Sequence, residues 1–207
     1  MKTRLLTISM IGILIIGSLW ANKNNEIEIK EGDIIFQTSK SEQSKPIQIA
    51  TKSKYSHCGI IYKKGNDFYV YEAVGPVKLT PFKQWIAHGK NNSYVIKRLK
   101  NSENLITPDV LSNMKKVGDQ LKGKPYDTTF EWSDNNIYCS ELVWKIYQRG
   151  AGIEIGKLQR LIEFDLSDAS VKAIMKRRYH GKIPTEEIVI SPGALFNSNL
   201  LVTVKGN

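Results

Sequence analysis

Short apolar runs bounded by polar residues occur in the chain's first half, and their bulky, strand-forming residues predict β-strands. Residues 33–37 form the first run and residues 94–99 form the last. Between them, residues 56–63 and 67–73 are two runs rich in strand-forming residues on either side of the polar, glycine-containing segment 63–66. Two such runs joined by a short turn are typical of a β-hairpin.

Helical spacing and capping signals dominate the rest of the chain. Residues 139–148 carry a helical stripe of apolar positions, which we expect Gly150 to end. Thr80-Pro81 and Thr107-Pro108 each join a capping residue to a proline, as helix starts do. The expected helices are 44–50 with Ser44 as cap, 80–85, 107–121, 139–148 and 167–178, with one further turn opened by Ser191-Pro192. Strands that come first, with helices around them, predict an α+β fold.

The N-terminus has the pattern of an export signal. Lys2 and Arg4 precede an apolar stretch from Leu5 to Trp20, and Ala21 and polar residues follow. This stretch is shorter than the roughly 20 residues of a spanning helix. Leucine at position 19 is unfavourable for cleavage after Ala21, so an uncleaved anchor is the alternative. We therefore predict a signal peptide or N-terminal membrane anchor over 1–21 and a single domain over 22–207.

Composition and charge narrow the range of functions. The chain of 207 residues is 41% hydrophobic and 24% charged, which is typical of a globular protein with a sizeable core. The formal charge is +10, and without Lys2 and Arg4 it is +8, from 28 basic and 20 acidic residues. Because these charges are scattered, we interpret them mainly as a solvated surface, although cell-wall polymers or acidic lipids would also be attracted. Export argues against a nucleic-acid partner.

The predicted hairpin places a histidine beside a carboxylate. If its loop is centred on Lys64 and Gly65, His57 lies directly opposite Glu72 with both side chains on one face. A carboxylate beside an imidazole fixes its tautomer and raises its basicity, as in a catalytic triad. A loop longer by one residue would instead place Ala73 opposite His57.

The chain has two cysteines, and their expected settings differ. Cys139 begins a predicted helix, where the helix dipole stabilises a thiolate and free backbone N–H groups can bind an oxyanion. Cys58 alternates with Ile60 and Tyr62 on the strand face opposite to His57. We therefore expect Cys58 to be a packed core thiol, poorly placed to attack a substrate or to bridge to a cysteine that faces His57.

Several motifs resemble a known enzyme family. Gly123-Lys124-Pro125-Tyr126 followed by Tyr138-Cys139-Ser140-Glu141-Leu142 resembles a region of NlpC-type cell-wall hydrolases, except that the histidine here precedes the cysteine. That order resembles the YiiX-like permuted papain-like amidases over nearly the whole chain after the apolar stretch. Further segments that carry the likeness are 32–37, 71–73, 77–81, 85–87, 163–166 and 191–192.

The resemblance implies a papain-like α+β fold, with a small antiparallel sheet or barrel packed against helices, and Cys139, His57 and Glu72 as the triad. The expected function is exported, envelope-located hydrolysis of amide bonds through a thioester, with cell-wall peptides as the first substrate class. A lipid amide or ester hydrolase or acyltransferase at a membrane surface is the second hypothesis, and a catalytically inert binding module is the third. Gln37 is a candidate oxyanion donor. The sequence shows neither metal-ligand spacing nor a phosphate-binding loop, so we expect no metal and no cofactor.

Overall fold

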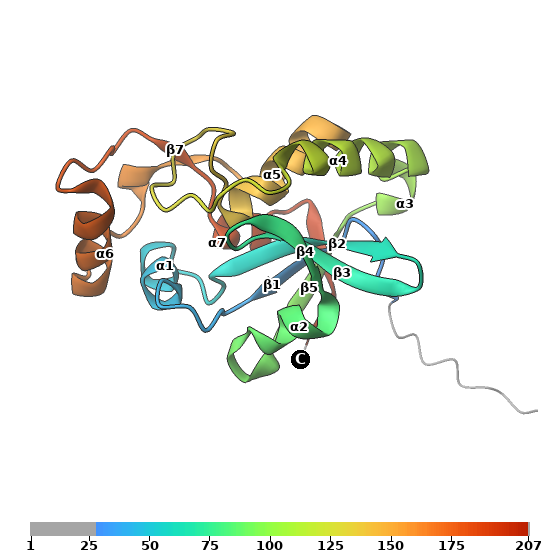
Figure 1. The fold of residues 1–207 in the computed structure, drawn as a ribbon, viewed down its shortest axis with the longest axis horizontal. Coiled ribbons are helices and arrows are strands. Elements are labelled where there is room, and N and C mark those ends of the chain that lie inside the picture. Colours follow the sequence, from blue (N-terminus) through green and yellow to red (C-terminus); the bar gives the residue numbers. More distant parts are fainter. Residues whose placement is uncertain (1–27, 207) are drawn as a thin grey trace, which may run out of the picture.

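A six-stranded antiparallel sheet forms the centre of the computed structural model, which describes residues 28–206 (Figure 1). Its strand order is β4-β3-β2-β1-β5-β8, and every neighbouring pair is antiparallel. The strands are β1 (Ile34–Gln37), β2 (His57–Lys64), β3 (Asp67–Ala73), β4 (Val77–Pro81), β5 (Val95–Leu99) and β8 (Leu201–Gly206). Two short strands, β6 (Gln159–Arg160) and β7 (Ile188–Val189), form a separate ribbon.

Helices cover both faces of this sheet. Helix α5 packs on β2 and β3 with α4 beside it, and α2 packs on the opposite face against β3 and β4 (Figure 1). The helices are α1 (Ser44–Ala50), α2 (Phe82–Ala87), α3 (Ser102–Leu105), α4 (Pro108–Leu121), α5 (Cys139–Ala151), α6 (Ala169–Tyr179) and α7 (Pro192–Phe196), with 3-10 turns η1 (Lys90–Asn92) and η2 (Leu161–Glu163). The predicted α+β class, with an antiparallel sheet packed against helices, is confirmed.

Strand alternation divides the apolar residues into two cores. The larger one lies under α5 and includes Phe36, Cys58 and Ile60 from the sheet. The smaller one, on the other face, is built around Trp85 of α2 and includes Ile61. A third cluster lies beside the sheet, where α1 packs against α6. The sheet therefore separates two apolar layers, and neighbouring residues of β2 enter different ones.

Three helix starts differ from the sequence prediction. Strand β4 continues through Pro81, so Thr80 does not cap a helix, and α2 begins only at Phe82. Ser44 lies inside the first turn of α1 rather than at its cap. Helix α6 begins two residues later than expected, with Asp168 as its N-cap. The Thr107-Pro108 and Ser191-Pro192 starts are confirmed.

Gly150 lies inside α5 rather than at its end, at the point where α5 packs closely against α4. The helix continues to Ala151, and Gly152 supplies the left-handed C-cap with φ of 69°. A Cβ atom at Gly150 would lie 2.6 Å from the Cα atom of Met114 in α4. Glycine therefore permits the close approach of α4 and α5, and the sequence signal for a helix end was in fact a packing signal.

The hairpin register is shifted by two residues from the prediction. Lys64 pairs with Asp67 and Ile60 with Tyr71, so the loop is two residues long. Continuing this register, Glu72 faces Gly59 rather than His57. A shift of two preserves the face on which each side chain lies, because side-chain direction alternates with a period of two. His57 and Glu72 thus become diagonal rather than direct neighbours, and they remain on one face.

None of the helices in residues 28–206 is long and apolar enough to cross a membrane. The predicted signal peptide or anchor over 1–21 lies outside the residues that the structure describes. The domain boundary that we expected after Ala21 therefore stays a prediction. Within 28–206, one central sheet organises the chain.

Candidate active site

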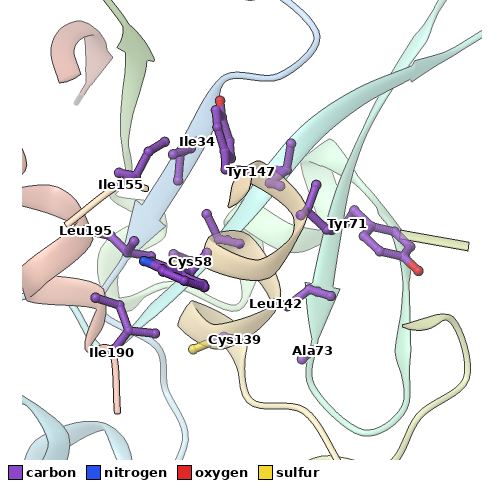
Figure 2. Packing of buried hydrophobic residues seen from close by; sticks show 14 of the residues in the cluster. Ile34, Cys58, Tyr71, Ala73, Cys139, Leu142, Tyr147, Ile155, Ile190 and Leu195 are labelled. Atoms are coloured by element: carbon purple, nitrogen blue, oxygen red, sulfur yellow. The ribbon is translucent and has the colours of Figure 1, made fainter. Parts of the chain in front are cut away.

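Cys139 is the first residue of α5, and the chain around it is held by hydrogen bonds to a distant segment. The Ser140 hydroxyl donates to the Ile190 carbonyl at 2.8 Å, and the Ile190 N–H donates to the Tyr138 hydroxyl at 3.1 Å. The Glu141 carboxylate accepts a 3.4 Å hydrogen bond from the N–H of Tyr138, the N-cap residue. The start of α5, which the sequence predicted at Cys139, is therefore fixed in position. Figure 2 shows Cys139 at this end of α5, near Ala73 and Ile190.

His57 and Glu72 form a buried pair at the same end of the sheet. The Nε2 atom of His57 lies 2.6 Å from Oε2 of Glu72, and these residues are 9% and 1% exposed. The indole of Trp85 stacks on the imidazole with ring centroids 5.7 Å apart. Because the carboxylate occupies Nε2, Nδ1 is the nitrogen left free to face Cys139, which raises the pKa of His57. The structure thus brings the three predicted residues together.

Two neighbours make the diagonal contact between His57 and Glu72 possible. Gly59 lies opposite Glu72, and a Cβ there would come within 2.5 Å of Val70 and 2.7 Å of the Tyr71 carbonyl. The Thr80 hydroxyl donates a 2.5 Å hydrogen bond to Oε1 of Glu72. Glycine therefore lets the two strands approach, and Thr80 fixes the second carboxylate oxygen. The sequence prediction missed Thr80 because its threonine-proline pair was interpreted as a helix cap.

The charges at this site favour a thiolate and an imidazolium. A hydrogen bond from the Cys58 thiol, together with His57, holds the pKa of Cys139 well below its usual range despite burial. Burial opposes the charge of His57, but Cys139 and Glu72 outweigh it and raise its pKa to about 10. Burial is likewise offset at Glu72, where His57 and Thr80 lower the carboxyl pKa. Such an arrangement is chemically able to supply an activated cysteine nucleophile.

Cys58 meets one of the two expectations for it, burial in the core, but not the other, separation from Cys139. It is a core thiol, as predicted, with no exposed surface, and burial raises its pKa well above the usual value. However, Cys58 is the main group that lowers the pKa of Cys139, so the expectation that it stands apart from a cysteine facing His57 is not met. The reason is that α5 covers the face of β2 that Cys58 occupies, while His57, the first residue of β2, reaches Cys139 from the end of the strand.

A mostly apolar cavity opens beside Cys139. It lies between α1, α6 and the segment that contains β7, and its empty volume, including the open mouth, is about 700 Å³. Its apolar walls include Ile47, Ala50, Leu161, Phe164, Leu166, Val171, Ile174, Met175 and Val189. These positions come from elements that are far apart in sequence, so no local pattern predicted the cavity.

A second, polar groove lies on the histidine side of the site. It has an empty volume of about 970 Å³ and is lined by Gln37, Ser39, Ser41, Lys40, His57, Glu72 and His88, among others. Gln37 is 1% exposed and pairs with His57 in the β1–β2 register, and its amide atoms have no hydrogen-bond partner within residues 28–206. This candidate oxyanion donor therefore lines the groove, whereas Cys139 lines the cavity.

Polar side chains linked by hydrogen bonds form the wall between the cavity and the groove, and the sequence analysis did not predict them. Gln43, Ser56 and Tyr126 line both hollows. The Gln43 amide donates to the Tyr126 hydroxyl at 3.1 Å and accepts a 2.5 Å hydrogen bond from the guanidinium of Arg178. Arg178 also lies over the ring of Phe130, 4.9 Å from its centroid. Helices α1 and α6 are joined by these hydrogen bonds at the mouth of the apolar cavity.

A cysteine at a helix start that faces a histidine–carboxylate pair on an antiparallel sheet defines a papain-like cysteine hydrolase. The order of the residues, with histidine before cysteine, is the permuted one. The chain belongs to the permuted papain-like amidase family, YaeF/YiiX, C92 family, whose model matches residues 28–205. Membership of this family makes the chain a thiol amidase or peptidase, as the sequence predicted.

Two relatives support this assignment over most of their length. The Escherichia coli protein YiiX is 46% identical over 204 residues, which cover 99% of this chain and 96% of that protein. A solved structure of yiiX from Escherichia coli O157:H7 matches with a TM-score of 0.82 and 48% identity, covering 86% of this chain and 97% of that chain. The yiiX of that structure is described as a metalloprotein.

Proposed function

We propose that this chain hydrolyses amide bonds with Cys139 as nucleophile, His57 as acid and base, and Glu72 as the group that orients His57. The observation that carries this proposal is the buried 2.6 Å contact between His57 and Glu72 next to a cysteine that begins a helix. The lowered pKa of Cys139 and the raised pKa of His57 support an ion pair at rest. Such a pair is poised both to attack a carbonyl and to protonate a leaving amine.

The reaction follows two steps. The Cys139 thiolate attacks the carbonyl carbon, the C–S bond forms, and the backbone N–H of Cys139 donates to the oxyanion. The C–N bond breaks as His57 gives its proton to the leaving nitrogen, which leaves a thioester. Neutral His57 then takes a proton from water, hydroxide adds to the thioester, and the C–S bond breaks to release the acid and restore the ion pair.

The pH dependence of turnover follows from the two shifted groups. Cys139 loses its proton well below the value of about 8.5 that is usual for thiols, and His57 keeps its proton up to about pH 10. The reactive ion pair exists between these limits. We therefore expect a bell-shaped profile of kcat/KM with its basic limb near pH 10 and its acidic limb well below pH ~8.5. A rate that rises only above pH ~8.5 would contradict a resting thiolate.

Glu72→Gln is expected to lower kcat by about 10²–10⁴-fold while the fold is retained. The amide keeps the size of the carboxylate but removes the charge that stabilises imidazolium at His57, and it can select the wrong tautomer. Steady-state kinetics on the variant measure the loss. The matched control is Glu163→Gln, at an exposed carboxylate in η2 that should leave kcat unchanged. Equal kcat values for Glu72→Gln and the wild type would remove Glu72 from the mechanism.

The cavity and the groove favour a substrate with two unlike halves. The acyl half, which becomes bound to Cys139, has apolar walls available beside that sulfur. The amine half receives its proton from His57 and therefore leaves on the side of the polar groove. We propose N-acyl amides with an extended apolar acyl group and a polar amine as the substrate class. The burial of apolar acyl surface supplies about 25 cal/mol per Å².

The same observation yields a test of acyl-chain selection. Ala50→Leu adds bulk to the wall of the cavity, so KM for long-chain N-acyl amides should rise by roughly tenfold while short-chain substrates are little affected. Ala169→Leu, at the exposed start of α6, is the control. Kinetics across a chain-length series separate the two variants. Parallel loss on every chain length would instead indicate damage to the fold.

Cell-wall peptides are the second candidate substrate, favoured by the serine and lysine side chains of the polar groove. Incubating the protein in parallel with N-acyl amides and with peptidoglycan fragments, with Cys139→Ala as blank, separates the two classes. Turnover of only the muramyl peptides would overturn the acyl proposal and keep the amidase mechanism. Export to the cell envelope, with 1–21 as signal or anchor, is part of this proposal, because both substrate classes occur there.

A metal does not enter this mechanism. The solved relative is described as a metalloprotein, and a resident metal would need three or four protein ligands. Within residues 28–206, no three or more His, Cys, Asp or Glu side chains gather closely enough to hold an ion. The residues present therefore do not fit a resident metal site of the usual three or four protein ligands.

A further inference from the structure

Arg178 brings a positive charge to the wall of the apolar cavity. It lies on the face of α6 that also carries Val171, Ile174 and Met175, and all four side chains line the cavity. Their spacing of three and four residues places them in one stripe along the helix. Among the described residues that line this cavity, Arg178 is the one lysine or arginine. Contact with an acyl chain alone does not account for a cation at this position.

The guanidinium of Arg178 is held by neutral groups. It donates a 2.5 Å hydrogen bond to Oε1 of Gln43, and it lies over the ring of Phe130 at 4.9 Å from the ring centroid. Within residues 28–206, no carboxylate forms an ion pair with it. Asp127 attracts it without such a contact, and Oδ1 of Asp127 accepts two hydrogen bonds from Thr129.

A half-buried charge without an ion-pair partner distinguishes Arg178 from Arg98 and Arg149. Arg98 forms a 2.7 Å ion pair with Asp33, and Arg149 forms one of the same length with Asp134. Burial lowers the pKa of the Arg178 guanidinium. Removing a charge from water costs free energy that a nearby opposite charge offsets. An anion from outside the chain would therefore stabilise Arg178 in the cavity wall.

The guanidinium has free donors for such an anion, and it lies at a boundary. Arginine carries five N–H donors in a planar fork that fits two oxygens of a carboxylate or phosphate. Within residues 28–206, the side chain of Arg178 has one hydrogen bond, to Gln43. Gln43 donates to the Tyr126 hydroxyl at 3.1 Å, and Gln43 and Tyr126 line both the cavity and the polar groove. Arg178 is thus close to the place where the acyl half of a substrate meets its polar half.

We propose that Arg178 binds an anionic group, a carboxylate or a phosphate, on the polar half of an N-acyl amide substrate. The acyl chain occupies the apolar cavity, and the anion lies beside the guanidinium where the cavity meets the groove. The reacting groups carry a net negative charge, from Cys139 and Glu72 against His57, and Arg178 offsets their repulsion of an anionic substrate. This inference rests on the proposed function and deepens it, because it makes the amine half of the substrate negatively charged.

Lys40 is a rival position for the anion. It lines the polar groove, it is exposed, and its ammonium group donates a 2.9 Å hydrogen bond to the Ala87 carbonyl. Water screens an exposed ammonium group, so an ion pair there contributes little. The half-buried Arg178 should therefore supply most of the preference for an anion.

Ligand binding to the Cys139→Ala protein tests this site without turnover. Isothermal titration calorimetry compares N-dodecanoylglycine, N-dodecanoylethanolamine phosphate and the neutral N-dodecanoylglycinamide, which share one acyl chain. We expect an anionic ligand to bind more tightly than the neutral one. Adding Arg178→Gln should weaken anionic binding by about 10–100-fold and leave neutral binding unchanged. Retained binding of the neutral ligand shows that the variant is folded. The anion with the larger loss, carboxylate or phosphate, is the one that Arg178 selects.

Arg177→Gln is the matched control, because Arg177 is the exposed neighbour in α6 that does not line the cavity. It should leave the preference for anions unchanged, while Arg178→Lys, which keeps the charge but loses the fork, should retain part of it. Equal weakening of anionic and neutral ligands by Arg178→Gln would overturn the proposal. So would a preference that Lys40→Gln removes and Arg178→Gln leaves intact, or no preference for either anion.

The two proposals fail separately in these measurements. Binding to the Cys139→Ala protein does not depend on hydrolysis, so a preference for anions that depends on Arg178 would still be seen if the amidase proposal failed. Turnover of the neutral amide by the wild type would still be seen if the preference for anions were absent.

Discussion

Replacing Cys139 by alanine is expected to lower kcat for amide hydrolysis by about 10⁴-fold or more. The thiolate supplies the C–S bond of the intermediate, and no other described residue at the site can replace it: Cys58 is protonated and lines neither hollow. Residual turnover would come from substrate binding and oxyanion contacts alone. Steady-state kinetics with a sensitive N-acyl amide measure the loss.

Cys139→Ser is the informative partner of this variant. Serine preserves the size and the hydrogen bonding of the side chain, but its hydroxyl has a far higher pKa, so the imidazolium of His57 does not hold it ionised. We therefore expect serine to restore little activity. Thermal unfolding should place both variants close to the wild type, since each removes only a small buried group. A Cys139→Ala protein with a tenth or more of the wild-type kcat would exclude Cys139 as the nucleophile.

His57→Asn is expected to have the second large effect, again on the order of 10⁴-fold in kcat. The variant removes the proton donor for the leaving amine and the cation that stabilises the thiolate. Two readouts should move together: kcat falls, and the pH midpoint for alkylation of Cys139 rises toward the value of about 8.5 usual for a thiol. A structural disturbance alone would not couple these two measurements.

The control for this variant is His180→Asn. His180 is exposed and caps α6 with φ of 49°, a left-handed conformation that asparagine tolerates. The His180→Asn variant should leave both kcat and the pH profile for alkylation of Cys139 unchanged. An alkylation midpoint that His57→Asn does not raise would show that His57 does not stabilise the Cys139 thiolate.

Much of the site could be predicted from sequence because the signals were local. The helix that begins at Cys139 and the hairpin that carries His57 and Glu72 are each encoded in one continuous segment of the chain. The exact register was wrong by two residues, since apolar alternation alone does not fix the position of a turn: the loop is Gly65 and Asn66 rather than Lys64 and Gly65. The error preserved the faces, and the contact between His57 and Glu72 survived for that reason.

What could not be predicted depends on contacts between distant segments. The position of Cys58 relative to Cys139 requires knowing which face of the sheet α5 covers, and alternation does not specify that. The apolar cavity requires α6 to pack against α1, more than 100 residues away in sequence. Thr80 was misassigned because a threonine-proline pair signals both a helix start and, as here, the end of a strand.

Iodoacetamide labelling at about pH 6 tests the central claim most directly, because few thiols are ionised there. The wild-type protein is incubated with limiting reagent, digested and mapped, with glutathione as the reference thiol. We predict an adduct on Cys139, formed faster than on glutathione, and Cys58 unlabelled. Preferential labelling of Cys58, or labelling of Cys139 no faster than of glutathione, would contradict the assignment of Cys139 as the activated nucleophile.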